Sequence, residues 1–165
     1  FPEEGKYHYD GHRLCKFSCA PEETKKLNKL CPKCGKPMTV GVMYRVDELA
    51  DRPAGGAPPA GAIPFTSMVP LDEIIAGAFG VGTASKKVKE EYRRLTEKVG
   101  TEFAVLIDAP QSDLMFATTP EIMEGIMRVR QGKLHIEPGY DGEYGHVKIF
   151  EEGERIAATP QASLF

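Results

Sequence analysis

The clearest hydrophobic pattern lies in the middle of the chain, where apolar residues return at the spacing of an α-helix. Residues 86–99 carry one apolar stripe at i, i+4, i+7 and i+11, made of Val88, Tyr92, Leu95 and Val99. Gly100 follows this stripe and is a residue type that commonly ends helices. The pattern predicts a helix over residues 86–99.

Further helices are expected on both sides of this one. Residues 71–79 (LDEIIAGAF) place their large apolar side chains along one face, and a glycine follows. Residues 120–131 begin with Pro120 at the first helical position, after Thr119 as N-cap, and again a glycine follows. The apolar run 101–108 fits either a strand or a buried helix, and its polar first residues favour a helix.

Alternating apolar and polar residues predict a β-hairpin near the end of the chain. The two strands are residues 133–137 and 146–150, and residues 138–145 (PGYDGEYG) connect them. This connection is longer than a hairpin turn requires. It is either a long structural turn or a loop that presents a tyrosine for base stacking beside carboxylate acceptors, namely Tyr140 or Tyr144 with Asp141 and Glu143.

The first fifty residues contain a metal-ligand pattern. Four cysteines form two close pairs with the spacing C-x3-C-x11-C-x2-C: Cys15, Cys19, Cys31 and Cys34. Such pairs let thiolates from tight turns face one ion, and four sulfur ligands are typical of a closed, structural Zn²⁺ site. A segment this short needs such a staple because it buries little apolar surface. Two disulfides are the alternative arrangement, and His8 and His12 are alternative ligands or neighbours of the site.

The residues after the cysteines complete a zinc-ribbon-like module. Residues 38–44 are expected to form a strand and residues 46–50 a short helix. Residues 51–62 (DRPAGGAPPAGA) are rich in Pro, Gly and Ala and are either a flexible linker or an ordered loop. The chain thus divides into a zinc-binding module (1–50), this linker, a helical domain with a terminal hairpin (63–150) and a tail (151–165). The expected fold class is α+β.

Composition narrows the class of protein. The 165 residues are 41% hydrophobic and 27% charged, which excludes a collagen, a coiled coil and a wholly disordered chain. No stretch has the roughly 20 consecutive apolar residues of a membrane helix, and no signal peptide is recognised. We therefore expect a cytoplasmic protein without membrane partners, associated with the bacterial nucleoid. Because the chain starts at Phe1, we also expect a piece of a longer protein.

A short turn between two predicted helices has the features of a helix-hairpin-helix DNA contact. Gly80-Val81-Gly82 separates residues 71–79 from residues 86–99, and glycines let backbone amides approach a phosphate. A hydroxyl and several basic residues follow: Ser85, Lys86, Lys87 and Lys89. The net charge of −3 gives no general attraction to DNA, so this local charge carries the prediction. A plain helical corner is the alternative.

The tail ends in a short peptide with a known type of partner. Gln161, Leu164 and Phe165 match the Q-x-x-L-F pattern with which bacterial repair and replication proteins dock on the sliding clamp. The two apolar side chains would fill a pocket on the clamp, and the amide of Gln161 would bond at its rim. The clamp is therefore an expected partner.

Several of these segments together resemble the C-terminal half of the endonuclease Q family. The resemblance runs from Tyr7 to about Phe150 and rests on residues 31–36 (CPKCGK), 41–52 (GVMYRVDELADR), the Gly80-Val81-Gly82 corner and residues 138–145. Members of this family are DNA-repair enzymes that incise 5′ to deaminated bases such as hypoxanthine and uracil, and to abasic sites. Related sequences are often labelled helicase-like.

The resemblance implies a division of labour. The catalytic metal centre of the family lies in an N-terminal PHP domain, and no part of this sequence matches it. We therefore expect the chain to be inactive alone and to hold damaged duplex or single-stranded DNA for the PHP domain of the parent protein. A zinc-ribbon module that recruits partners without binding DNA is the main alternative. An independent small-molecule enzyme is a third possibility, without a recognisable nucleophile and base.

Overall fold

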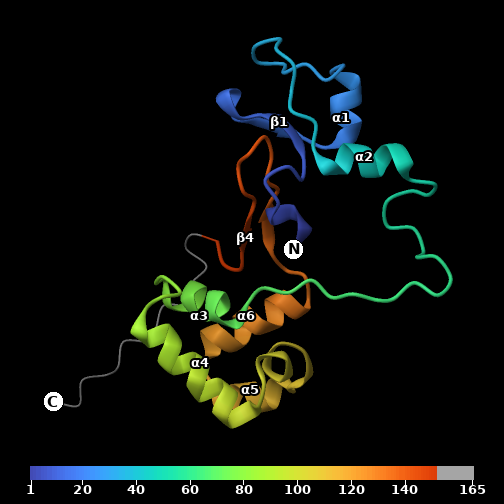
Figure 1. The fold of residues 1–165 in the computed structure, drawn as a ribbon. Helices are drawn as coiled ribbons and strands as arrows, with labels where there is room; N and C mark the ends of the chain where they lie inside the picture. The colour runs from blue at the N-terminus through green and yellow to red at the C-terminus, as the bar shows by residue number, and fades with distance from the viewer. Residues whose placement is uncertain (152–165) are drawn as a thin grey trace. The chain divides into compact units, whose positions relative to one another are not determined.

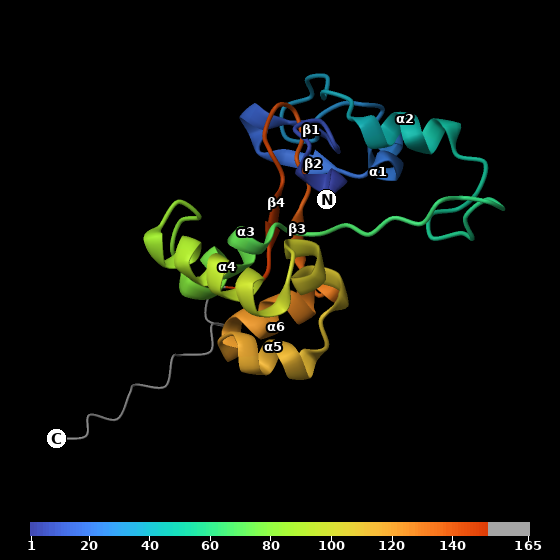
Figure 2. The same ribbon diagram turned by 60° about the horizontal axis from the view of Figure 1, so that its bottom comes forward.

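The structure, a computed structural model, describes residues 1–151. Its contacts divide the chain into two compact units. Among the described residues, the first unit comprises 1–67 and 136–147, and the second comprises 68–135 and 148–151. Figures 1 and 2 show short strands and short helices in the first unit and a group of helices in the second.

The first unit is built on a small antiparallel hairpin that begins after a 3-10 turn at Pro2–Glu4. Strand β1 (Asp10–His12) pairs with strand β2 (Phe17–Cys19), so that Asp10 lies opposite Cys19 and His12 lies opposite Phe17. A second 3-10 turn, η2 (Arg13–Cys15), joins the two strands. Helices α1 (Pro21–Lys26) and α2 (Val42–Leu49) pack against each other, and α2 also contacts β1.

Helix α2 corrects the expectation of a strand over residues 38–44 followed by a helix over 46–50. Gly41 is its N-cap, and the N–H group of Gly41 donates to the buried carboxylate of Asp10 at 2.6 Å. The next two N–H groups donate to the carbonyls of residues 7 and 8. Partners far earlier in the chain thus satisfy the first turn of a helix here. The local alternation of residue types carries no information about them.

Four α-helices lie in the described part of the second unit, and two of them have the bounds that the sequence predicts. Helix α3 (Leu71–Phe79) packs against α4 (Lys86–Val99) and α6 (Pro120–Arg130), and α5 (Gln111–Ala117) also packs against α4 and α6. Helix α5 was not predicted. The largest fully buried side chains of the unit include Leu71, Ile74, Ile75, Val88, Leu95, Leu114, Ile122 and Ile126. This apolar interior fixes the position of the α3–α4 turn.

A π-helix stands where an ordinary helix was expected over residues 101–108. The segment, η3 (Ala104–Asp108), is held by Arg130 of α6. The guanidinium of Arg130 donates to the carbonyl oxygens of Val105 at 2.8 Å, Leu106 at 2.9 Å and Ala109 at 2.7 Å. One cation therefore satisfies carbonyl groups that the irregular helix leaves without intrahelical partners.

The C-terminal hairpin forms as expected but is shorter, with strands β3 (His135–Glu137) and β4 (His146–Lys148). Its long connection is bonded to the first residues of the chain. The N–H of Gly139 donates to Glu3, the N–H of Gly145 to Glu4, and the N–H of Tyr9 to Gly139. Side chains on these glycines would collide with backbone atoms. The contacts group residues 136–147 with the first unit, whereas the order of elements in the sequence predicts the hairpin as part of the helical domain.

Together these elements confirm the α+β class, with helices in both units and two small antiparallel strand pairs. Residues 50–70 contain no helix or strand. Within residues 1–151, no helix has both the length and the apolar character needed to cross a bilayer.

Candidate metal centre and nucleic-acid contact residues

Four potential metal ligands meet at one end of the first hairpin. They are His12 at the end of β1, Cys15 in the turn η2, and Cys31 and Cys34 in the loop before α2. All four ligand atoms lie within 4.8 Å of one another, and the Sγ of Cys34 is 3.4 Å from the Nδ1 of His12. Three thiols and one imidazole at such separations match the donor set and the spacing of a tetrahedral zinc site.

The loop around Cys31 and Cys34 is shaped to aim its sulfur atoms. The carbonyl of Cys31 accepts the N–H groups of Cys34 at 3.3 Å and Gly35 at 2.7 Å. Gly35 has φ +72°, a left-handed conformation that favours glycine. The next N–H group, of Lys36, points at the sulfur of Cys34 and is the main reason why the pKa of this thiol is lowered. The loop therefore favours a thiolate at Cys34.

A lysine joins the two ligand segments. The Nζ of Lys33 donates to the carbonyl of Cys15 at 2.9 Å and to the carbonyl of Lys16 at 3.1 Å.

The thiol of Cys15 has its pKa raised to about 11, chiefly by the hydrogen bond with Cys34, then by burial and by Cys31. Neighbouring thiols raise the pKa in this way because a thiolate at Cys15 would lie beside the sulfur atoms of Cys34 and Cys31.

The observed group differs from the predicted ligand set by one residue. Cys19 lies outside it, and its Sγ is 3.2 Å from the Oγ1 of the buried Thr24. Burial is the first cause of the raised pKa of Cys19. The strand register explains the difference, because Cys19 lies opposite Asp10, two positions along the ladder from His12. Two strand residues span about 6.6 Å, which separates Cys19 from the turn that holds Cys15.

The α3–α4 turn has the geometry of an anion contact. Gly80 ends α3 in the left-handed region, with φ 65° and ψ 36°, and Val81 donates back to Ala76. Ser85 caps α4, where its hydroxyl accepts the N–H of Val88 at 3.3 Å. Within the described chain, the backbone N–H groups of residues 82–84 have no hydrogen-bond acceptor. Three free donors thus precede the N-terminus of a 14-residue helix.

The predicted basic residues surround this turn in different ways. Lys86 is 89% exposed and lies 3.5 Å from Glu90. The Nζ of Lys87 sits over the ring of Phe79, 3.8 Å from its centre. Lys89 faces a cavity between α3 and α4. Gly82, unlike Gly80, does not have a positive φ, and there is open space where its Cβ would be.

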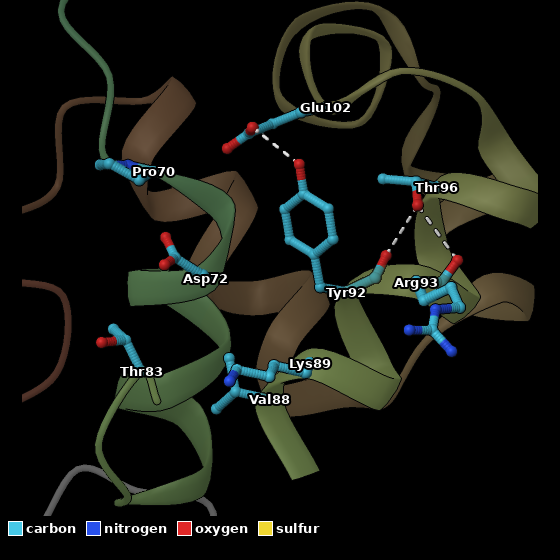
Figure 3. A pocket seen from close by; sticks show the side chains of 9 residues that line it. All are labelled: Pro70, Asp72, Thr83, Val88, Lys89, Tyr92, Arg93, Thr96 and Glu102. Carbon is cyan, nitrogen blue, oxygen red and sulfur yellow. Dashed lines mark hydrogen bonds between the residues drawn. The ribbon is translucent and has the colours of Figure 1, made fainter. Parts of the chain in front are cut away.

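The cavity between α3 and α4 was not anticipated from the sequence (Figure 3). Its volume is about 530 Å³. Tyr92 stands in its centre and donates its hydroxyl proton to the Oε2 of Glu102 at 2.9 Å, a bond that raises the pKa of Tyr92. The lining residues are Pro70, Asp72, Thr83, Val88, Lys89, Tyr92, Arg93, Thr96 and Glu102. Arg93, which was not predicted as a site residue, belongs to this cavity.

The two loop tyrosines have different environments. The half-buried ring of Tyr140 packs against Gly11, where any side chain would collide with it. Asp141 accepts the N–H of Arg13 at 2.6 Å and the hydroxyl of Thr39 at 2.5 Å, and although burial opposes it, these bonds lower its pKa. Tyr144 is 65% exposed, and the Nζ of Lys6 lies 4.6 Å from its ring centre. Tyr144 is thus the accessible ring of the pair.

The clamp-binding peptide, Gln161, Leu164 and Phe165, lies outside the described residues.

Comparisons with known proteins find one domain family and two uncharacterized relatives that match this chain. Residues 70–133 match the family described as the MJ0043 C-terminal domain. The uncharacterized protein MJ0043 of Methanocaldococcus jannaschii is 36% identical over 148 residues, which are 90% of this chain and 18% of that protein. The uncharacterized protein YqxK of Bacillus subtilis is 30% identical over 148 residues, 89% of this chain and 34% of that protein.

Two solved structures are similar over nearly the whole chain. The lesion-specific endonuclease PfuEndoQ from Pyrococcus furiosus has 36% identity and a TM-score of 0.76, covering 92% of this chain and 37% of that one. Endonuclease Q in complex with a 27-mer duplex substrate, with an abasic lesion at the active site, has 35% identity and a TM-score of 0.71, covering 94% and 39%. The chain thus spans well under half the length of these relatives. These matches confirm the resemblance found in the sequence: the chain belongs, in sequence and in fold, with the C-terminal domain of the endonuclease Q family.

Proposed function

We propose that the chain is the DNA-holding part of a DNA-repair endonuclease, and that its second unit grips the phosphate backbone at the α3–α4 turn. The observation that carries this proposal is the row of free N–H groups at residues 82–84, beside the exposed Lys86 and Lys87. Backbone donors at a helix N-terminus bind phosphate oxygens without reading base sequence. The similar endonuclease Q structure that contains a 27-mer duplex supports the same role.

The first unit has a proposed zinc centre that serves structure. His12, Cys15, Cys31 and Cys34 would hold the ion, and three thiolates with one imidazole leave no open position for water. When bound, zinc supplies a crosslink between the β1–β2 turn and the loop before α2. Lys33 reinforces the same junction through its bonds to residues 15 and 16. The residues around the site hold its shape and take no part in cleavage.

Incision belongs, in this proposal, to the PHP domain of the parent protein, with deaminated bases and abasic sites as its lesions. The exposed Tyr144 is the ring available for stacking beside a lesion, since Tyr140 is packed against Gly11. Docking on the sliding clamp through Gln161, Leu164 and Phe165 remains part of the proposal.

A salt titration tests the central part of the proposal. Binding to a fluorescein-labelled duplex with one deoxyinosine, and to the undamaged duplex, is measured by anisotropy for the wild type and for Lys86→Ala/Lys87→Ala. Each lost phosphate contact reduces the slope of log K against log salt by about 0.9. The double variant should therefore bind more weakly, with a slope lower by about 2.

The control is Lys98→Ala/Lys133→Ala, which makes the same charge change in the second unit away from the turn. Its slope should stay close to that of the wild type. Equal losses in both double variants would mean diffuse attraction and would refute a grip at the turn. If neither the wild type nor the variants bind DNA in a salt-dependent way, a zinc-ribbon interaction module would be favoured instead.

A further inference from the structure

The charged side chains that line the cavity between α3 and α4 differ in whether they already have hydrogen-bond partners within the protein. Glu102 is already satisfied, because its Oε1 accepts the N–H of Leu71 at 2.8 Å and its Oε2 accepts the hydroxyl of Tyr92 at 2.9 Å. Asp72 lies in the first turn of α3, accepts the N–H of Glu73 at 3.0 Å, and is stabilised by the helix dipole. Both carboxylates thus accept hydrogen bonds from groups of the protein itself.

The two cations of the cavity, Lys89 and Arg93, have no such partners in the described part of the chain. The side-chain nitrogens of Lys89 and Arg93 have no hydrogen bond or ion pair with any described residue. They lie one turn apart on α4, about 6 Å along the helix axis. The neighbouring cations of this helix are engaged, Lys86 with Glu90 and Arg94 with Glu91. Two cations without a bonded partner among the described residues thus line the cavity, and each can form a charge-assisted hydrogen bond with an anionic ligand.

The rest of the lining indicates which other chemical groups an anionic ligand of this cavity would have. The ring of Tyr92, the side chain of Val88 and the ring of Pro70 give an apolar surface. Figure 3 shows Tyr92 in the middle of the lining, with Lys89 on the side towards α3 and Arg93 on the other side. A volume of about 530 Å³ lies within the ordinary range of small-molecule sites and is too small to admit a duplex. Thr83 belongs both to this lining and to the turn whose N–H groups are free.

We infer that the cavity binds one unpaired nucleotide of a DNA strand, with its phosphate on Lys89 and Arg93 and its base or sugar against Tyr92. This inference rests on the proposed function, because the strand reaches the cavity from the α3–α4 turn. It adds a single-strand site to the backbone grip. The locked Tyr92–Glu102 pair holds the ring upright, so that binding needs no rearrangement of the site.

The test uses the whole chain, ¹⁵N-labelled, titrated with a 5′-phosphorylated thymidine tetranucleotide. Amide shifts are expected at Thr83, Tyr92 and Thr96. Lys89→Ala and Arg93→Ala should each weaken the affinity about fivefold, the effect of one exposed charged contact. Lys98→Ala, which removes a cation of the same helix outside this cavity, should leave the affinity unchanged.

Two further ligands separate the sources of binding. Thymidine without phosphate should bind far more weakly, and inorganic phosphate should not shift Tyr92. Equal shifts with inorganic phosphate would reduce the site to a simple anion contact and overturn the inference. Shifts that avoid Thr83, Tyr92 and Thr96 would overturn it as well.

The proposed function can fail separately. If duplex binding still depends on Lys86 and Lys87 while the tetranucleotide leaves the cavity unperturbed, the single-strand site alone is wrong. If the tetranucleotide binds in the cavity while duplex binding ignores the two lysines, the backbone grip is wrong.

Discussion

At the scale of single residues, the position of a cysteine on its strand decides whether it reaches the candidate metal site. Cys15 leaves the hairpin at its turn and faces His12 and the Cys31–Cys34 loop. Cys19 is carried two ladder positions away and is 3.2 Å from the hydroxyl of Thr24. A thiol in that position stabilises the packing behind the site instead of binding the ion.

Cys19→Ser should therefore keep the metal, whereas Cys31→Ser should lose it. We expect about one zinc per chain in the first variant and well below one in the second, measured by elemental analysis of protein purified without chelator. His12→Ala should also fall below the wild type, because it removes the fourth ligand. Loss of zinc in Cys19→Ser together with full zinc in His12→Ala would restore the four-cysteine set and refute the observed one.

The sequence could predict a cluster of cysteines but not which four residues form the candidate metal site. The short spacing between Cys31 and Cys34 forces both into one loop, and this part of the site follows from sequence alone. The choice between His12 and Cys19 depends on strand register, which is set by contacts between distant residues. Arg93 and Glu102 were missed as site residues for the same reason, since a cavity between α3 and α4 exists only once the helices are packed.

At the scale of elements, the crossing of α3 and α6 depends on one glycine. A Cβ on Gly125 of α6 would lie 2.9 Å from the Cγ2 of the buried Ile74 of α3, closer than carbon atoms pack. Gly77 of α3 has open space where its Cβ would be. The two positions are therefore a matched pair, both glycines within helices of one unit.

Gly125→Ala should destabilise the second unit by about 1–3 kcal/mol because it overpacks the interface. Gly77→Ala should stabilise it by about 0.5–1 kcal/mol, since alanine favours a helix over glycine. Urea unfolding followed by circular dichroism measures both. Equal effects of the two substitutions would mean that α3 and α6 do not pack through Gly125.

The contact of α4 with the segment after α5 should depend on pH. Burial favours the neutral form of Glu91, but hydrogen bonds from Arg94 and from the hydroxyl of Thr118 outweigh it, so that its pKa lies below the ordinary 4.5. A carboxyl with a lowered folded-state pKa stabilises the fold above the unfolded pKa, and this stability is lost as the pH falls below about 4.5.

Glu91→Gln should accordingly be less stable than the wild type by about 1 kcal/mol at pH 7. The difference should shrink as the pH is lowered from about 4.5 towards the folded pKa of Glu91. Free energies of unfolding for both proteins at a series of pH values give this comparison. If the difference in unfolding free energy between the two proteins stays constant over this pH range, the ionised form of Glu91 does not stabilise the fold through Arg94 and Thr118.

The elements also show where local sequence is a sufficient guide. The stripe on α4 and the glycine that follows it gave the correct bounds, because the interior of the second unit is built from this stripe. Helix α2 could not be predicted, since its first amides bond to residues 7–10. The π-helix η3 likewise depends on Arg130, which is more than twenty residues away in the chain.

At the scale of the whole molecule, the two units differ in what stabilises them. The buried apolar side chains described in the first unit are few, namely Pro21, Cys31, Met38 and Tyr44, whereas the second unit buries a continuous set from α3 to α6. A small apolar interior cannot offset the entropy of ordering the chain. The first unit should therefore depend on its metal, and the second should not.

Removal of zinc with a chelator should unfold the first unit selectively. Hydrogen exchange measured by mass spectrometry should show loss of protection in residues 8–19 and 30–44. Peptides from α3, α4 and α6 should exchange as before. Unchanged protection around Cys15 and Cys31 after complete removal of the metal would mean that the group His12, Cys15, Cys31 and Cys34 has no structural role.

The most direct test of the account concerns the α3–α4 turn. The ¹⁵N-labelled, zinc-loaded chain is titrated with an undamaged duplex at low salt, and amide shifts are followed residue by residue. We expect the largest shifts on Gly82, Thr83 and Ala84, whose N–H groups have no acceptor within the described chain. These shifts should be lost in Lys86→Ala/Lys87→Ala. Shifts that leave these amides unmoved while the duplex binds elsewhere would contradict the proposed grip on DNA.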